Sequence, residues 1–252
     1  MNTASTKSKT LRVAVEGRNL EDLLPLLEQF PCTIVTEAPE LVITHGGDGS
    51  LLGAERKYPG IPKCPIRDRK RNPKCPRHDE LTTLKHLFEG TLNVSHLTKL
   101  QVTTQAGESL TAINDIILDR VNPTAAIRYR IWVNGELIRP RVVADSLLFS
   151  TPFGSTGYFL SITRGTFSTG IGLAFNNPMD LFGHTVVPED STIRVQLLRG
   201  PALLVADNNP KQIPVNTDET LEISVLPEKT RLYGLDVFRC MDCFDLRKNG
   251  NF

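Results

Sequence analysis

The chain has little net charge, no long apolar run and only five cysteines. Its 29 lysines and arginines nearly balance 28 aspartates and glutamates, so the composition gives no reason to expect a nucleic-acid or membrane partner. No apolar run is long enough to span a bilayer. The polar stretch Met1–Thr10 is not followed by an apolar segment, so we expect no signal peptide. The five cysteines argue against a disulfide scaffold and favour a cytoplasmic protein with reduced thiols or a metal site.

The pattern of apolar residues differs between the first and the second part of the 252-residue chain. In the first part, short apolar stretches predict strands on either side of a helix expected at Glu21–Phe30, the pattern of a parallel sheet covered by helices. These expected strands are Leu11–Val15, Cys32–Val35 and Leu41–Thr44. From Leu97 onwards apolar residues alternate with a period of two, and Asn134-Gly135 predicts a hairpin, which indicates a β-sandwich.

The expected fold class is therefore α/β + β. We predict an N-terminal Rossmann-like parallel α/β domain at residues 1–98 and a C-terminal β-sandwich domain at 99–235. Residues 236–252 form a C-terminal segment, for which packing back on the N-terminal domain is one arrangement that we consider.

The segment Pro59–Arg77 is rich in proline and basic residues and contains Pro-Lys-Cys-Pro twice, so we expect a long exposed loop. Its basic side chains predict a solvated surface, or alternatively a positive funnel for the phosphates of a donor. These residues are Lys63, Arg67, Arg69, Lys70, Arg71, Lys74 and Arg77.

The first motif with chemical meaning is Gly46-Gly47-Asp48-Gly49-Ser50, between an apolar strand and the start of a helix. Glycines there allow unusual backbone conformations, and a helix N-terminus attracts phosphate. The charge of Asp48 opposes phosphate unless the side chain holds a metal or takes a proton from an attacking hydroxyl. The alternative is a simple Asp-Gly turn.

Two further motifs lie in the predicted β-rich part. Asn114-Asp115 interrupts an apolar strand, where a buried polar side chain needs a partner such as a ligand hydroxyl; the alternative is a water-exposed strand end. The run from Asp145 through Thr151-Pro152-Phe153-Gly154-Ser155-Thr156-Gly157-Tyr158 to Ser161 carries hydroxyls at a turn and helix start. Ser155 and Thr156 could cap that helix or hold a sugar or phosphate oxygen.

Together, in this order, the three motifs resemble the NAD kinase family. That family shows Gly-Gly-Asp-Gly-Thr, then Asn-Glu, then Asp-Gly followed by Thr-Pro-Thr-Gly-Ser-Thr-Ala-Tyr. In this sequence Asp115 stands in place of the usual glutamate and Gly157 in place of the usual alanine. The family's Gly-x-Asn-x-Gly-x-x-Gly-Phe-Leu segment is missing, and Ile61–Arg71 stands there instead.

The resemblance implies an NAD kinase that uses ATP, with Mg²⁺, or polyphosphate to phosphorylate the 2′-hydroxyl of the adenosine ribose of NAD, giving NADP. By position, Asp48 would take the proton of that hydroxyl, and Gly46, Gly47, Gly49 and Ser50 would approach phosphate. NAD, expected in a cleft between the two domains, would be held by Asn114, Asp115, Asp145, Thr156, Gly157, Tyr158 and Ser161. The family tends to form homodimers and homotetramers.

Two alternatives remain open at this point. The missing segment favours a nucleotide-binding regulator of the NAD kinase fold that is inactive or repurposed. The Gly-Gly-Asp-Gly loop is also similar to that of lipid kinases, such as the diacylglycerol and sphingosine kinases. The sequence leaves the phosphate donor and the choice between NAD and NADH undecided.

Four cysteines have the spacing of metal ligands in two pieces. Cys64 and Cys75 lie in the basic segment, with His78 three residues after Cys75. Cys240 and Cys243 form a Cys-x-x-Cys pair near the C-terminus. Convergence of the two pairs would make a structural zinc site. The alternative is ordinary reduced cysteines, because the spacing of the first pair is unusual.

Overall fold

A computed structural model describes residues 10–70, 78–180, 183–243 and 245 of the protein. It divides into two compact units, the first made of residues 1–96 and 230–252 and the second of residues 97–229. Within the described ranges, none of the helices is both long enough and apolar enough to cross a membrane.

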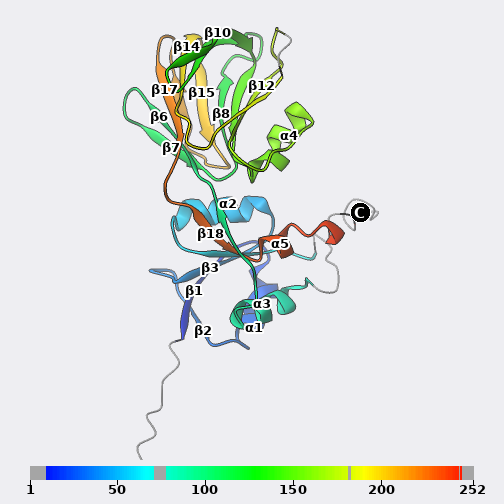
Figure 1. Ribbon diagram of the computed structural model, residues 1–252. Helices are drawn as coiled ribbons and strands as arrows, with labels where there is room; N and C mark the ends of the chain where they lie inside the picture. The colour runs from blue at the N-terminus through cyan, green and yellow to red at the C-terminus, as the bar shows by residue number, and fades with distance from the viewer. Residues whose placement is uncertain (1–9, 71–77, 181–182, 244, 246–252) are drawn as a thin grey trace, which may run out of the picture. The chain divides into compact units, whose positions relative to one another are not determined.

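The first unit is built on a six-stranded sheet (Figure 1). Its order is β2 (Cys32–Ile34), β1 (Leu11–Gly17), β3 (Leu41–His45), β4 (Lys63–Ile66), β18 (Thr230–Tyr233) and β5 (Val94–Leu97). The pairs from β2 to β18 are parallel. The helices are α1 (Leu20–Leu27), α2 (Asp48–Lys57), α3 (Glu80–Phe88) and the short α5 (Leu235–Phe238). Helices α1 and α3 share one hydrophobic cluster with the sheet, while α2 packs through Ala54 in a separate cluster with Ala14 and Val42.

Strand β4 contradicts the prediction of a long exposed loop at Pro59–Arg77. All four residues of β4 are buried, including Pro65, and the strand pairs with β3 along its length. Val42 N–H donates to Pro62 O, and Gly46 N–H donates to Ile66 O, which places the missing donor of Pro65 on the side away from β3. On that side β18 pairs with β4 at Lys63, so the proline costs the ladder little.

Strand β18 also differs from the sequence prediction. The alternating pattern near Leu232 placed this strand in the β-sandwich, but it joins the sheet of the first unit beside β4. The chain thus returns to the first unit at Thr230, a few residues before the expected boundary at 235. Val237 of α5 packs against the core of that unit.

The second unit consists of two six-stranded antiparallel sheets around one hydrophobic core. One sheet has the order β10 (Glu136–Ala144), β9 (Ile127–Val133), β14 (Ile193–Arg199), β17 (Thr220–Val225), β6 (Leu100–Thr104) and β7 (Ser109–Ala112). The other has the order β13 (Thr185–Val187), β12 (Ile171–Asn176), β11 (Ser146–Ser150), β8 (Asp115–Arg120), β15 (Ala202–Ala206) and β16 (Ile213–Val215). The predicted hairpin at Asn134-Gly135 is confirmed, since both residues have positive φ between β9 and β10.

A short helical segment follows β11. It consists of a 3₁₀ turn at Gly154–Thr156 and the helix α4 (Tyr158–Thr163), which lies beside β12 (Figure 1). Phe159 of α4 is fully buried and packs with Leu148 and Ala174, so this apolar side chain fixes the hydroxyl-rich turn against its sheet.

Candidate active site

The glycine loop, Gly46-Gly47, follows the buried strand β3 and leads into α2, as the sequence predicted. Gly46 has φ +138°, a conformation that favours glycine, and a Cβ there would lie 2.4 Å from Ser50 Oγ. Gly47 is the N-cap residue of α2 and provides no side-chain cap. Asp48 occupies the first helical position. The positive end of the helix therefore lies at this loop.

His45, the last residue of β3, directly precedes the glycine loop. Its ring is fully buried, and Nδ1 lies 2.7 Å from the carbonyl oxygen of Arg18. Burial alone would lower the pKa of His45, but the Glu80 carboxylate and the Arg18 carbonyl outweigh it and raise the pKa above its usual value. A Cβ on Gly17 would lie 2.0 Å from the carbonyl oxygen of His45, so this close approach requires glycine. His45 has a structural role in this arrangement.

Asp48 lies between two guanidinium groups. Its Oδ2 is 3.3 Å from an Arg67 amino nitrogen, and its Oδ1 is 3.6 Å from an Arg239 amino nitrogen. The Asp48 side chain is still 42% exposed, so a ligand can reach it. The local charge of this group is positive, because two cations face one carboxylate.

The two arginines are held by α5 and by burial. Arg67 Nε donates to the carbonyl oxygen of Phe238 at 3.0 Å, and the guanidinium lies 3.9 Å from the centre of the Phe238 ring. Burial lowers the pKa of Arg239, the nearby Asp48 charge opposes this shift, and Arg67 adds to it. The C-terminal segment thus delivers Phe238 and Arg239 to the glycine loop.

The sequence pattern did not indicate that either arginine is a partner of Asp48. The prediction of a solvated surface is wrong for Arg67, which is buried, and for Lys63, which is buried and forms an ion pair with Glu55. The alternative prediction, that basic side chains of this segment face the phosphates of a donor, stays a prediction for Arg67. The basic character of the segment was visible in the sequence. Nothing in the sequence pattern connected Arg239 with Asp48.

In the second unit, the predicted Asn114-Asp115 pair is held by Asp207. One carboxylate oxygen of Asp207 accepts from the N–H groups of Asn114 and Asp115 at 2.9 and 3.1 Å, and the other accepts from Ile113 N–H at 2.9 Å. Asp207 itself has φ +47°, and its N–H donates to the carbonyl oxygen of Asp115. These reciprocal bonds fix the entry to β8.

Asp115 is buried, Asn114 is partly buried, and both side chains carry polar atoms that can bind a ligand. Among the residues that the structure describes, Asn114 Oδ1 is a buried acceptor with no hydrogen-bond partner. Asp115 is 8% exposed. Burial, together with the charge of Asp207, raises the pKa of Asp115 to about 7. A carboxyl group that is half protonated near neutral pH can donate to or accept from a ligand hydroxyl.

Gly154 packs against the same pair. A Cβ at this position would lie 2.1 Å from the carbonyl oxygen of Asn114, so only glycine allows this approach. Thr151 completes the contact, because its hydroxyl donates to Ile113 O at 2.5 Å and its N–H donates to Asn114 O at 2.9 Å. The third sequence motif thus lies directly against the second.

The remaining predicted residues do not all gather at this point. Thr156, Gly157, Tyr158 and Ser161 are exposed on the turn and α4. Asp145 lies at the opposite end of β11 from Ser150, the residue that pairs with Asp115. There it forms an ion pair with Arg120 and accepts from Asn177 Nδ2 at 3.1 Å. The Tyr158 hydroxyl lies nearer that end, because it accepts from Asn176, the partner of Ser146 in β12.

The predicted four-cysteine set is not the one that the structure assembles. Cys64 lies in β4, fully buried in the hydrophobic core, and burial raises the pKa of its thiol to about 12, which opposes the thiolate that zinc requires. Cys75 falls outside the described residues. Cys240 and Cys243 do lie together, and their neighbour is His78.

Comparisons with known proteins agree with these motifs. The family model described as the ATP-NAD kinase C-terminal domain matches residues 113–235, which include the second and third motifs. An NAD kinase of Brucella suis biovar 1 is 30% identical over 191 residues, which are 70% of this chain and 73% of that protein. The chain belongs to the NAD kinase family. Another member, an NAD kinase of Shewanella halifaxensis, is 26% identical over 230 residues, 86% of this chain and 71% of the relative.

Solved structures of this family share the fold. Yeast NADH kinase, complexed with NADH, matches with a TM-score of 0.78 at 16% identity and covers 98% of this chain and 90% of its own. An NAD kinase from Archaeoglobus fulgidus in complex with ATP matches with a TM-score of 0.72 at 17% identity, over 96% of this chain and all of its own. The NAD kinase fold therefore extends over both units of the chain.

Proposed function

We propose that this protein is an NAD kinase that transfers the terminal phosphate of ATP to the 2′-hydroxyl of the adenosine ribose of NAD, giving NADP. The observation that carries the proposal is the position of Asp48. In a chain of the NAD kinase family, this carboxylate stands at the first position of α2, directly after the glycine loop, and remains accessible between two guanidinium groups. Neither a lipid kinase nor an inactive regulator is favoured by this membership.

Each part of the loop has a role in phosphoryl transfer. Asp48 accepts the proton of the ribose hydroxyl as the bond to phosphorus forms. The helix N-terminus and the guanidinium groups of Arg67 and Arg239 offset the negative charge of phosphate near that carboxylate. Positioning and charge stabilisation supply most of the catalysis of this reaction class.

A divalent cation fits the chemistry of this loop. Mg²⁺ prefers hard oxygen ligands and is bound mainly through substrate phosphates with one or two carboxylates. At the loop the Asp48 carboxylate already faces Arg67 and Arg239. In the proposed role Asp48 accepts a proton, so Mg²⁺ would be held mainly by the phosphates of the donor. When bound, Mg²⁺ neutralises charge on the transferred phosphate.

The second unit supplies contacts to NAD in this proposal. Asn114 Oδ1 and the carboxyl of Asp115 accept or donate hydrogen bonds with ligand hydroxyls, and Gly154 and Asp207 hold the two residues in place. The exposed Thr156, Gly157, Tyr158 and Ser161 and the distant Asp145 remain candidate contacts. ATP is the proposed phosphate donor, with polyphosphate as the alternative. The protein is proposed to be cytoplasmic and to form a homodimer or homotetramer.

The Asn114→Ala variant is expected to bind NAD about 5- to 150-fold more weakly, because a lost hydrogen bond to a ligand hydroxyl costs on the order of 1–3 kcal/mol. The fold should persist, since the backbone bonds of residue 114 to Asp207 and Thr151 do not use its side chain. Calorimetric titration with NAD measures the change. Asp115→Ala is expected to act in the same direction.

Asn122→Ala is the matched control, because this amide sits in a surface turn beyond the other end of β8 and bonds to Thr124. It should bind NAD as the wild type does. A thermal-shift screen of the wild type with NAD, NADP, NADH, ATP and a lipid headgroup accompanies the titration. Stabilisation by the headgroup rather than by the nucleotides, or unchanged NAD affinity of Asn114→Ala, would contradict the proposed site.

A further inference from the structure

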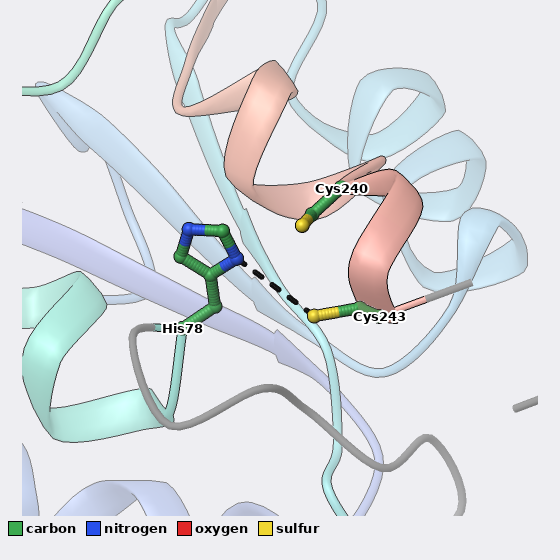
Figure 2. A group of neighbouring side chains, drawn as sticks. All are labelled: His78, Cys240 and Cys243. Carbon is green, nitrogen blue, oxygen red and sulfur yellow. Dashed lines mark hydrogen bonds between the residues drawn. The ribbon is translucent and has the colours of Figure 1, made fainter. Parts of the chain in front are cut away.

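Two cysteines of the C-terminal segment and one histidine, all common metal ligands, lie together in the first unit. His78 stands two residues before α3, while Cys240 and Cys243 follow α5 as a Cys-x-x-Cys pair. One imidazole nitrogen and the two sulfur atoms all lie within 4.8 Å of one another. Figure 2 shows the three side chains pointing toward a common space from two different parts of the chain.

The geometry is close to that of a tetrahedral zinc site. Zinc binds sulfur at about 2.3 Å and histidine nitrogen at about 2.0–2.1 Å, so a nitrogen and a sulfur on one ion are about 3.6 Å apart. His78 Nδ1 and Cys243 Sγ are 3.7 Å apart. The distance limit on the third ligand, Cys240 Sγ, also allows the sulfur-to-sulfur separation of about 3.8 Å that zinc requires.

We propose that His78, Cys240 and Cys243 bind one zinc ion, whose fourth position is taken by water or by a further ligand. Two thiolates and an imidazole select zinc over Mg²⁺ or Ca²⁺, which prefer oxygen ligands. Cys243 is 1% exposed, but His78 and Cys240 are half-buried, so the ion has a route of entry and a partly dry site.

The zinc ion joins the residues before α3 to the segment that follows α5. The residues directly before Cys240 are Phe238 and Arg239, which contact Arg67 and Asp48 at the glycine loop. The ion therefore fixes the segment that places these groups. Metal binding itself does not depend on the proposed kinase activity; an effect of zinc loss on turnover would rest on it.

Metal content is the primary test. The full chain, purified without chelators, is expected to contain about one zinc per chain by elemental analysis. His78→Ala and Cys243→Ser should each lose most of it, and chelation should lower the melting temperature of the wild type but not of these variants. Cys32→Ser is the control: that half-buried thiol contacts Leu27 O, outside the cluster, and its loss should leave the zinc in place.

Cobalt substitution gives a second readout on the wild type alone. Co²⁺ in a Cys₂His site absorbs in the visible range as a tetrahedral ion and shows thiolate-to-metal charge transfer. This measurement tests the proposal even where a variant fails to fold. Wild-type protein that contains no zinc and takes up neither zinc nor cobalt would overturn it. A disulfide between Cys240 and Cys243, found by mass spectrometry of the native protein, would also overturn it.

Discussion

Asp48→Asn is expected to lower the turnover of NAD by roughly 10²–10⁴-fold, the usual contribution of a positioned general base. Asparagine keeps the shape of the side chain and can still accept from Arg67, but it does not take the proton of the ribose hydroxyl. Affinities for NAD and ATP should change much less, because the glycine loop and the contacts of the second unit remain. Steady-state kinetics with both substrates separate the two effects.

The control for this variant is Asp79→Asn. Asp79 is the N-cap of α3 in the same unit, where it accepts from Thr82 N–H at 2.7 Å, and asparagine caps helices equally well. Its turnover should match that of the wild type. A metal-holding role for Asp48 predicts instead that high Mg²⁺ partly restores the activity of Asp48→Asn. If Asp48→Asn turned over NAD at the wild-type rate, the proton-accepting role of Asp48 would be wrong.

Asp115→Asn is expected to change how stability depends on pH. The pKa of Asp115 is about 7 in the folded protein, against 3.8 as its ordinary value, so the native state holds this proton more tightly than the unfolded chain does. The resulting stabilisation is complete below about pH 4 and is lost as the pH rises to about 7. The difference of 7 − 3.8, about 3 pKa units, corresponds to at most about 4 kcal/mol. Asparagine, which never ionises, removes this loss.

Urea unfolding of both proteins at pH 5 and pH 8 measures the effect. The free energy of unfolding of the wild type should fall relative to that of Asp115→Asn between the two pH values, and groups common to both proteins cancel in the comparison. Asp190→Asn, an exchange at an exposed loop position, should run parallel to the wild type. A constant difference between wild type and Asp115→Asn would show that this carboxyl is ionised at both pH values.

Local signals made much of the fold predictable. The Asn134-Gly135 hairpin depends on a few neighbouring residues, and the structure confirms it. The entry of β3 into the glycine loop is local in the same sense. The rest depends on residues far apart in the chain. Arg67 bonds to a carbonyl 171 residues away, and no pattern near Arg67 indicates that partner.

The errors have related physical causes. The prolines and cations of Pro59–Arg77 resemble an exposed loop. Burial of β4 is nevertheless possible because Lys63 pairs with Glu55 and the missing donor of Pro65 faces away from β3. Cysteine spacing alone paired Cys64 with the C-terminal thiols. The structure places that thiol in the core and brings His78 to the C-terminal thiols instead. Spacing had linked His78 only with Cys75, three residues before it.

The most direct test of the account is the product of the reaction. The purified protein is incubated with NAD, ATP and Mg²⁺, and the product is characterised by mass spectrometry and ³¹P NMR. The expected product is NADP, with the new phosphate on the 2′-hydroxyl of the adenosine ribose and with ADP formed in equal amount. Folded protein that binds NAD but forms no NADP with either ATP or polyphosphate, or that phosphorylates a different hydroxyl, would contradict it.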